Sequence, residues 1–220
     1  MKHIINLTFH GIGNRTRLVE NGEDNYWINK DLFVNILNSV QCLSNVCITF
    51  DDGNISDFDI AFPELLKRRM VGKFFILTGM MNVNGYLSAK HIREISSYGM
   101  EVGIHGKNHI KWRGLSGDQL KSEIIDSKKK LEDIVCKPII SSSCPFGEYD
   151  SLVLKKLINA NYKYIYTSDR VPCLKNSWFR PRYSVRSKDN IDSIMKNINQ
   201  KYIIVNNFFK IIKICIKMKR

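Results

Sequence analysis

The sequence lacks the features that mark a membrane-spanning or disulfide-bonded protein. None of its apolar runs reaches the roughly 18 residues that a membrane-spanning helix needs, and its start lacks the apolar run of a secretory signal. We therefore expect a cytoplasmic protein. The six cysteines are irregularly spaced and form no C-x-x-C pair. This is typical of free thiols in a reducing compartment.

Repeats and low-complexity tracts are also absent. The 220 residues are 44% hydrophobic and 25% charged, as in an ordinary globular protein. This length suits one domain with an ample core. We predict a single domain over residues 1–220.

Acidic residues are scarce in the last quarter of the chain. The net charge is +13, and residues 170–220 supply +11 of it, with 13 Lys or Arg against two Asp. A basic end can attract anionic lipid, nucleic acid or an acidic glycan, or simply keep the protein soluble. No recognised nucleic-acid-binding motif accompanies the charge, so we expect no nucleic-acid partner.

Short β-rich runs alternate with longer periodic stretches along the chain. The predicted strands are Ile4–Phe9, Val46–Phe50, Lys73–Leu77, Met100–Ile104, Pro138–Ser143, Tyr162–Thr167 and Tyr202–Val205. The predicted helices are Asp31–Cys42, Asp59–Met70, Ser88–Tyr98, Ser116–Val135, Asp150–Asn159, Lys188–Asn199 and Phe208–Lys217. This alternation predicts an α/β fold with a parallel sheet, open or closed.

Ionisable side chains gather just past several predicted strands, where α/β folds place their chemistry. Asp51-Asp52-Gly53 follows one strand, and His105 begins an H-x-x-x-H segment after another. Adjacent strand residues point in opposite directions, so one carboxylate could hold a metal while the other takes a proton. Two imidazoles and one carboxylate make an open metal site that can acidify a water. Taken alone, the aspartates could be a surface turn and the histidines structural, but together they favour a metal centre.

A third segment, Ser143-Cys144-Pro145-Phe146-Gly147, leaves another predicted strand. Pro restricts one φ angle and Gly permits an unusual one, so this exit has a defined shape. Such a turn can aim a backbone N–H at a reacting oxygen. A plain surface turn is the alternative.

These three segments, in this order, resemble the polysaccharide deacetylase family (NodB-homology domain, carbohydrate esterase family four). Residues 49–53 are similar to its T-F-D-D-G motif, residues 101–109 to its motif ending in H-x-x-x-H, and residues 145–147 to the end of R-x-P-Y/F-G. The lead-out Leu115-Ser116 and Glu123 in the next helix are also family-like. The resemblance extends from about Leu7 to Asn199.

The resemblance implies a deformed (β/α)7 barrel and hydrolysis of an N-acetyl amide on an amino sugar. Asp52, His105 and His109 would hold a divalent metal, most often zinc, and Asp51 would be the general base. The backbone N–H of Phe146 would help to hold the oxyanion. The expected substrate is an N-acetylated glycan, or a lipid- or nucleotide-linked precursor of one.

Two positions depart from the family pattern. Ser143 replaces the arginine that pairs with the base, and either Arg180 or Arg182 could supply that charge from another loop. Asn206, past the last predicted strand, replaces the histidine that many members use as general acid. His10, past the first strand, is our candidate for that role, and a structural histidine is the alternative. A catalytically weak or inactive metal- and carbohydrate-binding homologue therefore stays an alternative function.

The C-terminal helix, expected at about residues 207–220, carries Lys210, Lys213 and Lys217 on one stripe, with apolar residues around most of the rest. An amphipathic helix of this kind can lie on anionic lipid. It can also be the last barrel helix with a solvent-exposed outer face. We retain peripheral membrane contact as an expectation to be tested.

Overall fold

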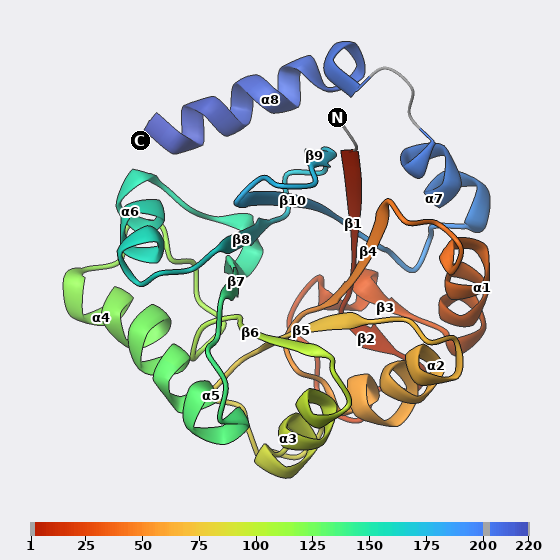
Figure 1. Ribbon diagram of the computed structural model, residues 1–220, viewed down its shortest axis with the longest axis horizontal. Helices are drawn as coiled ribbons and strands as arrows, with labels where there is room; N and C mark the ends of the chain where they lie inside the picture. Colours follow the sequence, from red (N-terminus) through yellow and green to blue (C-terminus); the bar gives the residue numbers. More distant parts are fainter. Residues whose placement is uncertain (1–2, 200–202, 220) are drawn as a thin grey trace.

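The computed structural model, which describes residues 3–199 and 203–219, is a closed parallel barrel surrounded by helices (Figure 1). Its seven parallel strands run in the order β10-β8-β7-β6-β5-β4-β1, and pairing of β10 with β1 closes the ring. They are β1 (His3–Phe9), β4 (Val46–Phe50), β5 (Gly72–Ile76), β6 (Glu101–Ile104), β7 (Ser141–Ser143), β8 (Tyr164–Thr167) and β10 (Phe179–Ser184). The predicted single-domain (β/α)7 barrel is confirmed.

Helices cover the outside of the ring (Figure 1). They are α1 (Lys30–Val40), α2 (Phe62–Lys67), α3 (Ala89–Ser97), α4 (Gly117–Lys121), α5 (Ser127–Val135), α6 (Ser151–Asn159), α7 (Ile191–Ile198) and α8 (Ile203–Lys219). The first helix shows why they pack there. Phe33, Ile36, Leu37 and Val40 recur at helical spacing, and all are buried in the core between helices and strands.

The faces of the strands that point into the barrel carry polar side chains, whereas the faces that point toward the helices are apolar. Along β1, Leu7 and Phe9 join the hydrophobic core, whereas Asn6 and Thr8 alternate with them and are also buried. Asn6 donates a hydrogen bond to the carbonyl of Pro181, and the Thr8 and Thr49 hydroxyls are 2.9 Å apart. The interior can therefore accommodate polar and charged groups that point toward one end of the barrel.

The seventh strand is not where the sequence predicts it. Ile203–Val205 begin α8, and Tyr202 lies outside the described residues. The strand that closes the ring is instead β10, Phe-Arg-Pro-Arg-Tyr-Ser. Its proline and two arginines argue against a strand, because proline cannot donate to a ladder and arginine is rarely buried without a partner.

Two predicted helices are interrupted. A π-helical turn at Asp57–Ala61 precedes α2, and another at Ser122–Asp126 separates α4 from α5. The long loop after β1 contains two short strands, β2 (Gly11–Ile12) and β3 (Trp27–Ile28), which pair with each other. The remaining strand, β9 (Cys173–Leu174), runs antiparallel to the start of β1.

The C-terminal helix α8 begins earlier than predicted and turns two of its lysines toward the barrel. Lys210 donates to the carbonyl of Arg170, and Lys217 pairs with Asp169 at 2.8 Å. The exposed side carries Ile212 and Ile216, with 40% and 47% of their surface accessible. Two of the three lysines of the predicted stripe therefore contact the barrel domain rather than line the exposed side of the helix. Membrane contact stays a prediction.

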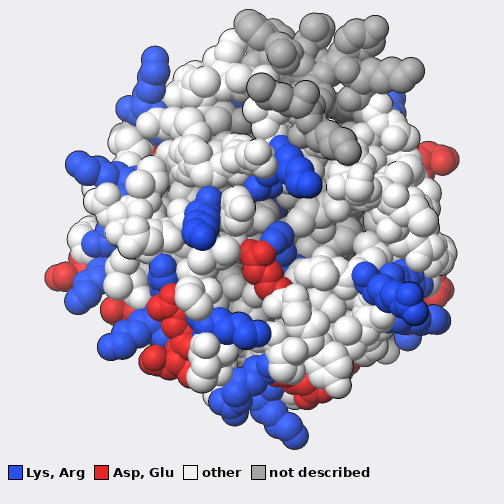
Figure 2. All heavy atoms as spheres, viewed as in Figure 1, with Lys and Arg blue, Asp and Glu red and all other residues white. Residues whose placement is uncertain are grey.

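No helix in the described ranges is both long and apolar enough to span a bilayer. On the face shown in Figure 2, Lys and Arg side chains are scattered around the molecule, with a smaller number of acidic groups between them. The excess positive charge does not form one continuous patch on that face.

Candidate metal centre and active site

Both aspartates of the Asp51-Asp52 pair enter the same pocket. Strand β4 ends at Phe50, and Asp52 and Gly53 then adopt left-handed φ angles of 75° and 70°. This turn overrides the alternation of a strand, which would have sent the two side chains to opposite sides. Only 2% of Asp51 and 3% of Asp52 is exposed. Two nearly buried carboxylates therefore lie side by side at one end of the barrel.

The two histidines converge from the segment after β6. His105 Nδ1 lies 3.0 Å from the carbonyl oxygen of Ser143, which requires a proton on Nδ1 and leaves the Nε2 lone pair free. His109 Nδ1 lies 3.3 Å from Glu20, so the same tautomer is favoured in the second ring. Burial lowers the pKa of His105 despite the nearby aspartates. A neutral imidazole is the form that binds metal.

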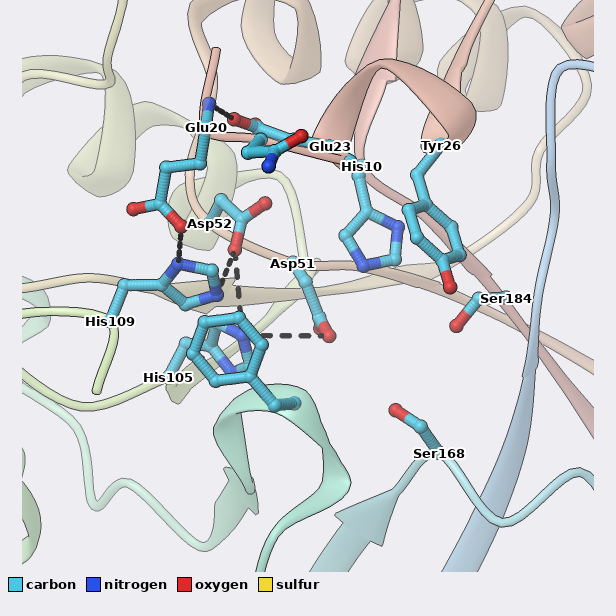
Figure 3. Close-up of a pocket in the computed structure, with 13 residues that line it drawn as sticks. His10, Glu20, Glu23, Tyr26, Asp51, Asp52, His105, His109, Ser168 and Ser184 are labelled. Atoms are coloured by element: carbon cyan, nitrogen blue, oxygen red, sulfur yellow. Dashed lines mark hydrogen bonds and ion pairs between the residues drawn. The ribbon is translucent and has the colours of Figure 1, made fainter. Parts of the chain in front are cut away.

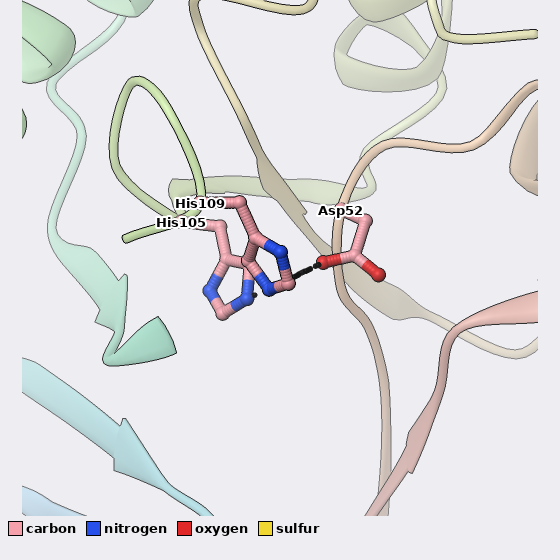
Figure 4. A group of neighbouring side chains, drawn as sticks. All are labelled: Asp52, His105 and His109. Carbon is pink, nitrogen blue, oxygen red and sulfur yellow. Dashed lines mark ion pairs between the residues drawn. The ribbon is translucent and has the colours of Figure 1, made fainter. Parts of the chain in front are cut away.

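Asp52, His105 and His109 form a compact set of three potential ligands (Figure 4). Asp52 Oδ1 lies 3.4 Å from His105 Nε2 and 3.6 Å from His109 Nε2. Ligand atoms around a tetrahedral zinc ion lie about 3.3 Å apart, close to these two distances, and all three ligand atoms lie within 4.8 Å of one another. Asp52 Oδ1 is also buried without a hydrogen-bond partner. A divalent cation would satisfy this oxygen, and the donor set fits one.

Glu123, between α4 and α5, holds the segment that carries the histidines. Its carboxylate accepts from the backbone N–H of Lys107 at 2.7 Å and from the indole of Trp112 at 3.3 Å. Gly106 has a φ of 90°, and a Cβ there would come within 2.4 Å of the Glu123 carboxylate. The sequence marks Glu123 only as family-like, whereas the structure explains how it fixes the loop between His105 and His109.

Arg182, from β10, binds the carboxylate of Asp51 with both terminal nitrogens, each at 2.6 Å. The guanidinium is fully buried and also donates to Ser143 Oγ at 2.6 Å. The proposal that Arg180 or Arg182 replaces the arginine missing at Ser143 is confirmed for Arg182. Arg180 instead donates to the carbonyl of Lys175.

This ion pair keeps Asp51 charged. Burial alone would raise the pKa of Asp51, but the Arg182 guanidinium outweighs that effect and holds the pKa well below its usual range. Asp51 Oδ2 also lies 3.7 Å from His105 Nε2, so the carboxylate adjoins the three potential ligands. It is placed to accept a proton from a group held between them.

The candidate residues share one pocket of about 260 Å³ (Figure 3). Asp51 lies between the two histidines of the metal set and His10. The His10 ring packs against Tyr26 at 5.0 Å, and its Nδ1 is buried without a partner. Phe146, which has a left-handed φ of 57°, stacks its ring on His109 at 4.3 Å. All six site residues predicted from the sequence thus line this pocket: His10, Asp51, Asp52, His105, His109 and Phe146.

Asn206 does not occupy the place that the sequence analysis gave it. It lies within α8, and the strand that ends at the pocket is β10, whose last residue, Ser184, lines the cavity. The long loop after β1 contributes Glu20, Glu23 and Tyr26 to the pocket. A residue this far along a polar loop carries no sequence signal for metal chemistry, so the role of Glu20 against His109 was not predicted.

Comparison with known proteins supports the resemblance seen in the motifs. A sequence profile for polysaccharide deacetylases matches residues 42–165. YxkH of Bacillus subtilis is 28% identical over 124 residues, which cover 56% of this chain and 44% of that protein. A peptidoglycan-N-acetylglucosamine deacetylase of Bacillus cereus is 28% identical over 121 residues, or 54% of each chain. The chain spans about half the length of these curated relatives.

Structural similarity to solved proteins extends beyond the segment that the sequence profile matches. A deacetylase of Streptococcus pyogenes, solved in complex with acetate, superposes with a TM-score of 0.78 at 22% identity, and the match covers 90% of this chain and 99% of that one. At this identity, the superposition supports the barrel alone. The sequence profile spans more than half of the chain and includes both aspartates and both histidines. The chain therefore belongs to the polysaccharide deacetylase family.

Proposed function

We propose that this protein is a metal-dependent hydrolase that removes N-acetyl groups from amino sugars of a glycan or of a glycan precursor. The observation that carries the proposal is the convergence of Asp52, His105 and His109 beside a separate charged carboxylate, Asp51. A site that only stored a metal would not need a buried base held by its own arginine. Family membership supports the same reaction class.

A divalent ion, zinc being our first choice, would be held by Asp52 and the two histidines and would supply Lewis acidity for the amide carbonyl and for water. Asp51 would take the proton from the attacking water. Arg182 keeps that carboxylate ionised and fixes both of its oxygens. Glu20 and the Ser143 carbonyl keep the Nε2 atoms of the histidines directed at the centre.

Two further roles are proposed for the opposite side of the pocket. His10 would give a proton to the leaving amine, since it lines the cavity across from the histidine pair (Figure 3). The backbone N–H of Phe146 would help to hold the oxyanion, and the 3-10 turn Pro145–Gly147 shapes its approach. The Phe146 ring is 49% exposed at the pocket and offers an apolar surface to a sugar face.

The alternative, an inactive homologue, rested on Ser143 and Asn206. Arg182 now fills the charge position that Ser143 leaves open, and Asn206 belongs to α8 rather than to the last strand. Neither residue therefore argues for lost turnover. A cytoplasmic location and a precursor substrate stay proposals.

Metal removal tests the proposal directly. We expect the purified protein to bind about one zinc per chain and to release acetate from N-acetylglucosamine oligomers or precursors. A chelator should abolish that release and added zinc should restore it. Metal analysis and an acetate assay on the same samples provide the measurement. One bound zinc with no acetate from any acylated sugar would instead support a binding protein.

His10 gives a second test. We expect His10→Gln to lower kcat by about 10²–10⁴-fold, because glutamine cannot donate a proton to the amine at neutral pH. Zinc content should stay normal, since His10 is not in the ligand set. His91→Gln is a matched control, because His91, in α3, stacks on Phe58 and does not line the pocket. Near-normal turnover of His10→Gln would exclude the acid role.

A further inference from the structure

A second hollow adjoins the catalytic pocket on the side of the long loop. It has a volume of about 300 Å³ and is lined by Gly22, Asn25, Tyr26, Arg186 and Lys188. Gly22 and Tyr26 line both pockets, so the two spaces meet at these residues. Tyr26 lies beside His10 at the edge of the catalytic pocket (Figure 3). A ligand larger than one sugar in the first pocket would therefore bring its neighbouring groups close to the second hollow.

The hollow is built from two segments that are tied together. Ser187 donates its backbone N–H to the carbonyl of Asn25 at 2.8 Å, which joins the segment after β10 to the long loop. The Arg186 guanidinium lies 5.5 Å from the centroid of the Tyr26 ring. This stacking holds the planar cation against one wall of the hollow.

Neither cation of this hollow has an anionic partner among the residues that the structure describes. Arg186 Nε is buried and donates to no acceptor in the described part of the chain. Neither Arg186 nor Lys188 takes part in any of the ion pairs that the structure shows among residues 3–199 and 203–219. An unsatisfied buried N–H of a charged group is costly, so an acceptor is expected there.

Two acids of these segments form other contacts. Glu23 binds the guanidinium of Arg17, and Asp189 accepts the backbone N–H of Arg186 at 2.9 Å. Neither acid forms an ion pair with Arg186 or Lys188 in the described part of the chain. A guanidinium and an ammonium that line one hollow suit a carboxylate or a phosphate, which accepts several charge-assisted hydrogen bonds.

We propose that this hollow is an anion subsite, in which Arg186 and Lys188 bind a carboxylate or phosphate carried by the substrate next to its N-acetylated sugar. The identity of the ligand as a substrate rests on the proposed function, whereas the anion site itself does not. The preferred substrates are then anionic amino-sugar conjugates, either carboxylated sugars or phosphate-linked precursors, rather than neutral homopolymers.

Product sugars test the subsite without interference from turnover. The zinc-loaded full chain is titrated with glucosamine 1-phosphate, muramic acid and methyl glucosaminide, which has the same amine but no anionic group, and Kd is measured by NMR. We expect at least one sugar with an anionic group to bind about tenfold more tightly than methyl glucosaminide. Arg186→Gln should reduce this preference to about threefold or less, and Lys188→Gln should reduce it by a smaller factor. The preference should also weaken with added salt.

The two anionic sugars distinguish the source of the charge, since the one whose affinity depends on Arg186 identifies phosphate or carboxylate. Arg93→Gln, on the exposed face of α3, is the matched control and should keep the full preference. An unchanged preference in Arg186→Gln would place the anion at the zinc or elsewhere and overturn the proposal. Equal weakening of all three sugars would do the same, because Arg186 would then only support Tyr26.

Acetate release from neutral N-acetylglucosamine oligomers is measured in parallel and bears on the proposed function alone. Turnover of the neutral oligomers without any anion preference would overturn the subsite and leave the deacetylase. An anion preference that depends on Arg186, without acetate release, would support the subsite and count against the deacetylase.

Discussion

Replacing Asp51 with asparagine is expected to lower kcat for acetate release by about 10²–10⁴-fold, because an amide cannot accept the proton of the attacking water. The substitution is nearly isosteric, but it leaves the buried Arg182 guanidinium without its carboxylate, so urea denaturation must first show that the variant is folded under the assay conditions. Asp51 is not one of the three converging ligands, and zinc should still bind. The expected result is therefore a zinc-containing protein with little turnover, measured by acetate assay and metal analysis on the same preparation.

The neighbouring aspartate provides the contrast for this experiment. Asp52→Asn removes the anionic member of the ligand set and should cost both zinc and activity. Asp59→Asn, on an exposed position of the next turn, should cost neither. If Asp51→Asn retained a tenth or more of the wild-type turnover with zinc bound, Asp51 would not be the base.

The resemblance to the family implies different roles for Asp51 and Asp52, but it does not give the geometry of the pair. The motif around Phe50-Asp51-Asp52 and the H-x-x-x-H spacing identify two ligand types and a base on one rim. The left-handed turn at Asp52, which brings both side chains into one pocket, has no sequence signal other than Gly53. In a strand, alternation would have separated the two carboxylates.

The strands were predicted where local pattern and burial agree. β4 is apolar except for Thr49 and has its predicted bounds. β10 was missed because its arginines and Pro181 resemble a loop, and only the long-range contact between Arg182 and Asp51 explains why a charge is buried there. The apolar run at Ile203–Val205 was taken for a strand, since a short apolar run does not distinguish a strand from a helix.

The same contact explains why Ser143 is compatible with a working base. A serine on β7 is small enough to let the guanidinium of Arg182 reach Asp51 from β10, and its hydroxyl accepts a hydrogen bond from that group. The positive charge beside Asp51 therefore comes from a different position in the sequence than the one in the family motif. Single-sequence reasoning could suggest a compensating arginine, but only the fold could decide between Arg180 and Arg182.

Loss of Arg182 is expected to have the largest effect on stability. Its guanidinium is fully buried and binds both oxygens of Asp51. Removing one partner of a buried ion pair leaves an uncompensated charge, which costs about 3–5 kcal/mol. We expect Arg182→Gln to lose that much unfolding free energy at pH 7, measured by urea denaturation with chelator present. The double variant Asp51→Asn/Arg182→Gln should recover part of the loss, because no buried charge remains.

The pH dependence of this loss tests its electrostatic origin. In the wild type, the pKa of Asp51 in the folded state is depressed. The ion pair with Arg182 therefore stabilises the fold fully above the ordinary carboxyl pKa of about 4. This stabilisation is lost as the pH falls toward the depressed pKa of the folded state. Without Arg182, burial raises the pKa of Asp51. The free-energy cost of burying the charged carboxylate is then greatest at neutral pH and falls as the carboxyl becomes protonated. The stability difference between wild type and Arg182→Gln should therefore shrink from pH 7 to about pH 5.

Arg180→Gln is the matched control for this titration. Arg180 is buried on the same strand, but it bonds to a backbone carbonyl and lies over the ring of Tyr164 rather than pairing with a carboxylate. The unfolding free energy lost in Arg180→Gln should not vary between pH 7 and pH 5. A deficit of Arg182→Gln that is equally constant would mean that lost packing, and not the uncompensated charge of Asp51, determines the stability of this end of the barrel.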